Sequence, residues 1–214
     1  MTVPATSVAT SVAATTGDTR ARLIEAAIDL CTVHTFAGTS LQMIADELGL
    51  TKAAIYHHFR TREELLDAVV GPILEQLRAV VDAAENQRST PARAECLING
   101  FAQLAVDNRV VSVLAADPSV AQMLRASKEW DTLIDRQMAV LAAVNPGPGG
   151  PVKAAVALAG IAGASTPGFA NLDRDELHAQ LLDAGRRVLG LRAPRRVSAP
   201  TDGSAPTDIE ESHD

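Results

Sequence analysis

The side chains with the clearest chemistry lie in one short stretch of the chain, residues 51–62. Its formal charges are all positive, and two histidines lie between them: Lys52, Arg60, Arg62, His57 and His58. Cationic and hydrogen-bonding side chains gathered on one surface bind phosphate oxygens. The whole chain carries a net charge of −7, but phosphate contacts depend on where the cations lie rather than on their sum. The stretch therefore indicates a nucleic-acid-binding surface.

The residue spacing does not favour other chemistries. His57 and His58 are adjacent, and neighbouring helical positions point about 100° apart, whereas a chelating pair on a helix needs i, i+4 spacing. Cys31 and Cys96 are far apart and fit no metal-binding spacing, so we interpret them as small buried hydrophobic residues. No glycine-rich phosphate loop follows a strand, and no serine stands in a nucleophile motif. We expect no enzyme activity, no cofactor and no metal.

The positive stretch belongs to two short helices joined by a glycine turn. Ser40 is suited to cap a helix over 41–48, and Gly49 is suited to end it in a left-handed conformation. Thr51 is suited to cap the next helix, over about 52–58. A small residue at the crossing and four apolar ones fix the angle between them: Ala45, Ile44, Leu48, Leu50 and Ile55. Such a helix-turn-helix presents its second helix to the major groove of DNA.

A helix over about 19–33 precedes this pair, with an apolar stripe that faces inward. A loop over 34–38 follows, and we expect Phe36 to fill the small core there. Residues 1–17 and 193–214 have low-complexity, polar compositions without a helical stripe. We expect both tails to be disordered.

A long helix, capped by Thr61 and running to about Val81, follows the pair, and Glu64 completes a capping box. Two apolar rows on this helix predict two packing surfaces, as for a helix shared by two domains. Gly71–Pro72 should interrupt the helix, and a kink is expected there because Pro72 removes one backbone hydrogen bond.

Residues 22–65 read RLIEAAIDLCTVHTFAGTSLQMIADELGLTKAAIYHHFRTREEL, which resembles the DNA-binding region of the TetR family of bacterial transcription regulators. The matching positions are Ala26-Ala27, Phe36, Thr39-Ser40, Ile44-Ala45, Leu48-Gly49-Leu50, Ile55-Tyr56, His58-Phe59 and Glu64-Leu65. Three positions depart from the family pattern. Thr35 stands where glycine is usual, Ala53 where glycine or proline is common, and Arg62 where lysine is usual.

The resemblance implies a set of DNA contacts that the side-chain chemistry supports. Polar and cationic groups would reach phosphates or base edges, and Ala53 would favour a thymine methyl group. The expected DNA-binding residues are Ser40, Gln42, Thr51, Lys52, Ala53, Tyr56, His57, His58 and Arg62.

The remaining chain also has helical periodicity, which predicts an all-α fold of about nine helices. A helix-turn-helix domain over 18–62 would be joined by the long helix to a ligand-binding and dimerisation domain over 63–192. Further helices are expected at 91–107, 109–116, 119–126, 129–144, 151–165 and 173–189. A ligand cavity is expected among the helices at 91–144, where few polar residues should converge, which favours an apolar or amphipathic ligand. The candidate lining residues are Phe101, Met123, Trp130 and Met138.

By resemblance, the last two helices would form a homodimer as a four-helix bundle, and two copies would read a palindromic operator. The function implied is a cytoplasmic, ligand-released repressor, since no signal peptide or membrane-spanning stretch is expected. The alternative is a helical ligand-binding or scaffolding protein whose helix-turn-helix does not engage DNA. Absence of the cations at 51–62 would mark that alternative, and they are present.

Overall fold

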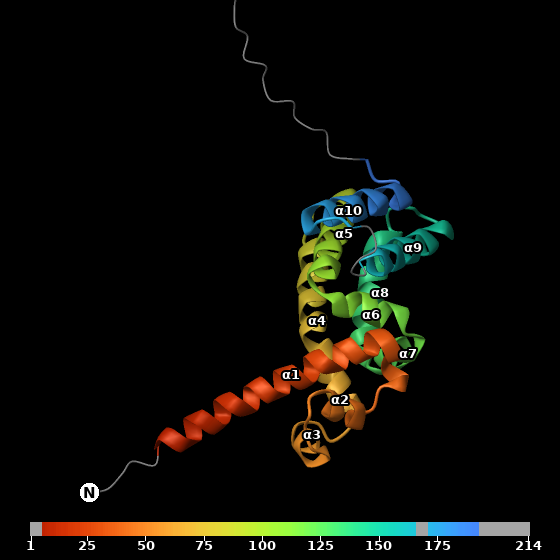
Figure 1. Ribbon diagram of the computed structural model, residues 1–214. Helices are drawn as coiled ribbons and strands as arrows, with labels where there is room; N and C mark the ends of the chain where they lie inside the picture. Colours follow the sequence, from red (N-terminus) through yellow and green to blue (C-terminus); the bar gives the residue numbers. More distant parts are fainter. Residues whose placement is uncertain (1–5, 166–170, 193–214) are drawn as a thin grey trace, which may run out of the picture.

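The computed structural model describes residues 6–165 and 171–192, and within these ranges the chain forms ten α-helices and no strand (Figure 1). The predicted all-α class is confirmed. The helices are α1 (Thr6–Gly38), α2 (Leu41–Glu47), α3 (Lys52–His58), α4 (Arg62–Glu85), α5 (Thr90–Asp107), α6 (Arg109–Ala116), α7 (Pro118–Ala126), α8 (Lys128–Ala142), α9 (Gly149–Ala164) and α10 (Arg174–Leu189). None of the described helices is long and apolar enough to cross a lipid bilayer.

The helix-turn-helix lies at one end of the molecule, where α2 and α3 follow the end of α1 (Figure 1). α9 and α10 pack against each other at the opposite end. α4 runs between the two ends and packs mainly on α5 and α8, while α6 and α7 contact the end of α1. This arrangement places α4, α6 and α7 between the helix-turn-helix and the rest of the chain.

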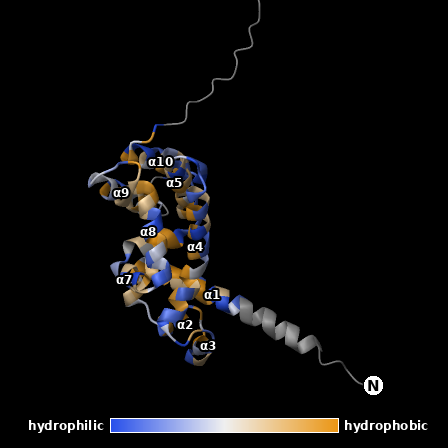
Figure 2. Cartoon of the chain, turned by 180° about the vertical axis from the view of Figure 1, so that it is seen from behind, coloured by the Kyte–Doolittle hydropathy of each residue, from blue (hydrophilic) through white to orange (hydrophobic). Residues whose placement is uncertain are grey.

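Two hydrophobic clusters hold these helices together. The smaller one lies among α1 to α3 and the start of α4: Leu23, Ala26, Ala27, Leu41, Ile44, Ala45, Ile55, Phe59 and Leu65. The larger one spans α4 to α10, and Figure 2 shows hydrophobic residues where α4, α8 and α9 face one another. α4 contributes Leu65 to the smaller cluster and Leu66 to the larger one, as its two apolar rows predict.

Three features of the helices differ from the sequence-based expectation. α1 begins at Thr6, so residues 6–17, expected to be part of a disordered tail, are helical. α4 runs through Gly71–Pro72 as one continuous helix and is not interrupted there. Residues 1–5 and 193–214 of the expected tails lie outside the described residues.

The third difference concerns the loop expected at 34–38, which is a sharp kink within α1. Thr35 alone leaves the helical conformation, with φ 61° and ψ 164°. Its side-chain oxygen accepts a hydrogen bond from the Gly38 N–H (3.3 Å), and its carbonyl accepts one from the Thr39 hydroxyl (2.8 Å). Phe36, expected in the smaller core, packs instead in the larger one, because the kink turns the chain toward α4 and α7.

The conformation of Thr35 is one that glycine adopts without strain and a β-branched residue does not. We therefore expect Thr35→Gly to raise the free energy of unfolding by about 1 kcal/mol, after allowing for the greater backbone entropy of glycine in the unfolded chain. Urea denaturation followed by circular dichroism measures the change. Thr35→Ala is the matched control, since it removes the same hydroxyl but keeps the Cβ atom and gains nothing. If the glycine variant were no more stable than the alanine variant, the backbone at residue 35 would not be strained.

Candidate nucleic-acid interface

The two short helices are held at their ends by the caps that the sequence predicts. The Ser40 hydroxyl oxygen accepts from the Met43 N–H at 3.1 Å, which begins α2. Gly49 adopts φ 64°, so the chain can turn sharply into the next helix. The Thr51 hydroxyl oxygen then accepts from the Ala54 N–H at 3.3 Å, which begins α3. These caps fix the start of each helix and the turn between them.

One buried side chain sets the rotation of α3 about its axis. Ile55 is fully buried and packs with Ile44 and Ala45 of α2 and with Phe59. Ala53, Tyr56 and His57 lie 100° or more around the helix from Ile55 and therefore face away from the core, and Lys52, the first residue of α3, is exposed beside Tyr56.

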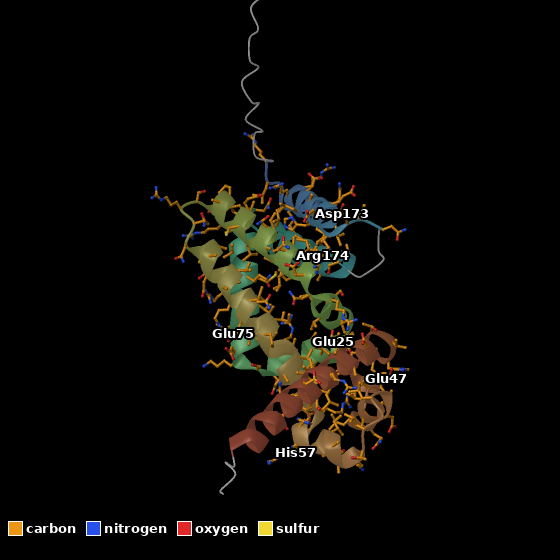
Figure 3. The ribbon with its side chains drawn as sticks, turned by 60° about the vertical axis from the view of Figure 1, so that its left-hand side comes forward. Glu25, Glu47, His57, Glu75, Asp173 and Arg174 are labelled. Atoms are coloured by element: carbon orange, nitrogen blue, oxygen red, sulfur yellow. The ribbon has the colours of Figure 1, made fainter. Side chains whose placement is uncertain are left out.

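The outward face of α3 carries most of the predicted DNA contacts. Lys52, Ala53, Tyr56 and His57 are all exposed, and the Tyr56 side chain is unusually open for an aromatic residue, at 44%. The Lys52 ammonium lies 5.7 Å from the centroid of the Tyr56 ring, which holds the two side chains together. Figure 3 shows His57 at the end of the molecule opposite Asp173 and Arg174. The structure thus brings cationic, phenolic and imidazole groups to one projecting surface.

His58 lies behind this surface and is half-buried. Its ring meets the His57 ring edge to face, with centroids 5.4 Å apart. Burial lowers the pKa of His58 below its ordinary value of 6.5, and the nearby charges of His57 and Arg20 lower it further. The lowered pKa favours the neutral form of His58.

The predicted contacts on α2 have partners within the protein. Gln42 is exposed, but its amide nitrogen donates to the Asp46 carboxylate at 2.6 Å. The oxygen of Ser40 is occupied as the cap of α2, although its hydroxyl hydrogen can still be donated. The Gln42 amide keeps its second N–H and its carbonyl oxygen for another partner.

Arg62, predicted to clamp a phosphate, is turned inward instead. Its guanidinium stacks over the Phe36 ring with 4.9 Å between the guanidinium carbon and the ring centroid. It also donates to the Phe36 carbonyl, which accepts the Thr39 N–H at 3.2 Å as well. The Nε atom of Arg62 is buried without a hydrogen-bond partner among the described residues. The side chain is thus committed to the interior, because the kink and end of α1 turn this carbonyl toward the start of α4.

Two cations that were not among the predicted contacts, Arg60 and Arg20, lie close to the end of α3. Arg60 is exposed directly after α3, and its backbone N–H donates to the Glu64 carboxylate at 2.8 Å. Arg20 of α1 is exposed and lies over the Phe59 ring at 5.0 Å. Arg60 could have been predicted, because it lies within the positive stretch 51–62. Arg20 could not, because its position over Phe59 depends on how α1 packs on the helix-turn-helix.

The end of α1 is joined to the larger core by Asp117, the residue that caps α7. The Asp117 carboxylate accepts the Phe36 N–H at 2.6 Å, and its other oxygen accepts the N–H and hydroxyl of Ser119 at 2.9 and 2.6 Å. Burial on its own raises the pKa of Asp117, but these hydrogen bonds outweigh it and hold the pKa below its ordinary value. An ion pair between Arg109 of α6 and Asp29 of α1, at 2.6 Å, lies at the same junction.

A cavity of about 350 Å³ lies among the helices above this junction. Three of the four predicted lining residues reach it: Phe101, Trp130 and Met138. Met123 does not line it and packs, partly buried, against the larger core. The walls come from six helices, α4 to α9, and include Ile73, Leu77, Val111, Leu124, Gln137 and Leu158.

Comparison with known proteins agrees with this geometry. Residues 23–69 match the sequence profile of bacterial regulatory proteins of the tetR family. The chain is 26% identical over 119 residues to the HTH-type transcriptional repressor KstR2 of Mycobacterium tuberculosis, covering 51% of this chain and 60% of that protein. It is 32% identical over 95 residues to the HTH-type transcriptional regulator TtgR of Pseudomonas putida, covering 43% and 45%. The matches thus span three fifths or less of these relatives.

Solved structures of regulators share the fold along most of the chain. The ketosteroid transcriptional regulator KstR2 of Mycobacterium tuberculosis superposes with a TM-score of 0.62 at 21% identity, covering 80% of this chain and 93% of that one. A bacterial regulatory protein of the tetR family from Rhodococcus RHA1 gives 0.58 at 20% identity, covering 81% and 98%. The profile of the TetR family thus matches the helix-turn-helix and the start of α4, and the fold of the whole described chain is that of these solved regulators.

Because Asp117 both caps α7 and binds the Phe36 N–H, its substitution should lower the free energy of unfolding more than the loss of an ordinary helix cap. Asp117→Ala removes the α7 cap and leaves the Phe36 N–H buried without an acceptor, so we expect the free energy of unfolding to fall by about 2 to 3 kcal/mol. Asp173→Ala is the matched control, because Asp173 caps α10 in the same way but is exposed. It should cost only about 1 kcal/mol.

Urea denaturation at pH 7 measures both decreases. Since the pKa of Asp117 is lowered on folding, its contribution is complete above the ordinary carboxyl pKa and disappears as the pH falls below it. The difference between the wild type and Asp117→Ala should therefore shrink in acid. Equal decreases for the two variants at pH 7 would show that the bond to Phe36 contributes nothing.

Proposed function

We propose that the protein is a transcription regulator that binds double-stranded DNA through α3 and is released by a small apolar or amphipathic ligand. The observation that carries the proposal is the exposed surface of α3, where Lys52, Tyr56 and His57 reach solvent while Ile55 packs in the core. A helix so presented fits the major groove. Repression would follow from occupation of a palindromic operator by a homodimer.

We propose two domains, each built around one of the two hydrophobic clusters. Residues 18–62 form the DNA-binding domain around the smaller cluster, and residues 63–192 form the ligand-binding and dimerisation domain around the larger one. The ligand would occupy the cavity of about 350 Å³, whose walls are mainly apolar. The related regulator KstR2 is described as a ketosteroid regulator, and an apolar cavity is compatible with a ligand of that polarity.

The junction at Asp117 supports a route from the ligand to DNA. Val111 of α6 and Ala121 and Leu124 of α7 line the cavity, and Asp117 stands between these two helices with its carboxylate on the Phe36 N–H. A ligand that moves α6 or α7 would move the end of α1 and, with it, the helix-turn-helix. The ligand shifts DNA binding only as far as it prefers one position of these helices over the other.

An exposed apolar face on α9 supports the homodimer. Val152 and Val156 are 62% and 53% exposed, one helical turn apart, and small exposed residues continue the same face: Ala159 and Gly160. Large apolar side chains so exposed mark an interaction surface. Small residues beside them let a second helix approach closely, so a second copy of the chain is the proposed occupant.

A single charge reversal tests the DNA-binding surface. We expect Lys52→Glu to weaken binding to DNA upstream of the protein's own gene at least tenfold. The salt dependence of the affinity should also decrease, by about one in slope for each phosphate that is no longer neutralised. Lys128→Glu is the matched control, since Lys128 is an exposed lysine on α8. Fluorescence anisotropy at several salt concentrations gives both quantities, and footprinting locates the site.

Equal effects of the two reversals would contradict binding through α3. A wild-type protein without measurable affinity for DNA would instead favour the alternative, a helical ligand-binding or scaffolding protein with an inactive helix-turn-helix.

The dimer is tested by placing a charge on the exposed face of α9. Val156→Glu should convert the dimer to a monomer, because burying an unpaired carboxylate between two copies costs several kcal/mol. Light scattering at micromolar concentration measures the mass. Val33→Glu is the matched control, because Val33 is 74% exposed on α1, away from α9, and it should leave the dimer intact. A wild-type monomer would refute the proposal directly.

A further inference from the structure

One buried side chain in the cavity lacks a hydrogen-bond partner. Gln137, in the middle of α8, is only 2% exposed, and its amide nitrogen has no acceptor within the described part of the chain. A buried N–H group without a partner destabilises the folded state, so such groups are rare in proteins and call for an explanation. Leucine or methionine would fill this position on an apolar helix face without that penalty.

The surroundings of Gln137 point to a ligand as the missing partner. Gln137 lines the cavity of about 350 Å³, and the wall residues from α4 and α5 are apolar: Ile73, Leu77, Phe101 and Leu104. Two other polar residues line the cavity, Arg125 and Asp131, but Arg125 is exposed and Asp131 is half-buried. Among the described lining residues, Gln137 is therefore the one polar side chain that is fully buried.

Water is a poor partner for this amide. A water molecule held inside a protein needs two to four polar partners, and among the described lining residues Gln137 is the one buried polar side chain. A charged acceptor is also disfavoured, because no cation among the described lining residues is buried beside Gln137 to offset the cost of removing a carboxylate from water. A neutral carbonyl oxygen on an otherwise apolar molecule meets both conditions.

We infer that the cavity takes an apolar ligand with a neutral carbonyl group, and that the Gln137 amide nitrogen donates to its oxygen. This inference rests on the proposed function, because it assigns a ligand class to the same cavity. A site built around a buried donor rejects an analogue that lacks the acceptor, since the donor is then left unpaired. Gln137 thus selects carbonyl compounds over hydrocarbons of the same shape.

Benzophenone and diphenylmethane form a matched pair of probes, because they differ only by a carbonyl group in place of a methylene group. We expect wild-type protein to bind benzophenone about tenfold more tightly than diphenylmethane in displacement of an apolar fluorescent dye. Gln137→Leu should abolish or reverse this preference, since it replaces the donor with an apolar side chain of similar size. Gln180→Leu, an exposed change on α10, is the matched control and should keep it.

A direct measurement on the wild type makes the test independent of any variant. The side-chain amide signal of Gln137 in a ¹⁵N–¹H spectrum should shift on addition of benzophenone and stay in place with diphenylmethane. The same preference in Gln137→Leu as in the wild type, or no binding of benzophenone by the wild type, would overturn the inference.

These measurements contain no DNA, so the two proposals can fail separately. If Lys52→Glu leaves DNA affinity unchanged while Gln137 selects benzophenone, the regulator proposal fails and the ligand class stands. If DNA binding depends on Lys52 but Gln137→Leu keeps the preference, the ligand class fails and the regulator proposal stands.

Discussion

The position of the helix-turn-helix depends on two hydrogen bonds between charged side chains and the backbone of Phe36. Thr35 leaves the helical conformation, which frees both backbone groups of Phe36 for partners outside α1. Asp117 accepts from the N–H and Arg62 donates to the carbonyl. Both partners are charged, and charge-assisted hydrogen bonds are the strong ones. They come from the cap of α7 and the first residue of α4, so a single residue of α1 joins three helices.

This junction links helices that line the cavity to the end of α1, and α1 packs against the helix-turn-helix. α7 is a short helix that begins at its cap Asp117, and its later residues Ala121 and Leu124 line the cavity. A small rotation of such a helix would move its cap and its cavity-lining residues together. α4 offers a second connection, because Leu65 packs in the smaller cluster while Ile73 and Leu77 line the cavity. The position of the helix-turn-helix relative to the cavity is thus fixed through two helices, α7 and α4.

The sequence predicts those features that depend on neighbouring residues. The caps at Ser40, Thr51 and Thr61 and the turn at Gly49 each need only three or four residues of context, and all four are present. The burial of Ile55 follows from helical periodicity in the same way. Thr35 was also visible, because it stands where the family usually has glycine, and it is the residue with the unusual backbone. Other features depend on contacts between distant parts of the chain and leave no local pattern.

Phe36 and Asp117 are 81 residues apart, and nothing near either residue indicates the bond between them. Arg62 looked like a surface cation because its neighbours are polar, yet the acceptor it meets is presented by the kink in α1. Gln137 stands in the apolar row of α8, four residues from Leu133 and from Leu141, so helical periodicity predicts its burial but not the missing partner of its amide nitrogen. That absence depends on how α4, α5 and α9 close around the side chain.

The role of α9 links the proposed dimer to the cavity. Ala155 and Ala159 line the cavity, and both are also exposed on the helix that carries Val152 and Val156. A second copy of the chain packed on α9 would press on the wall that the ligand touches from within. Ligand binding would then be coupled to the spacing of the two α3 helices through α9 as well as through α7. A dimer that binds two half-sites of DNA depends on that spacing.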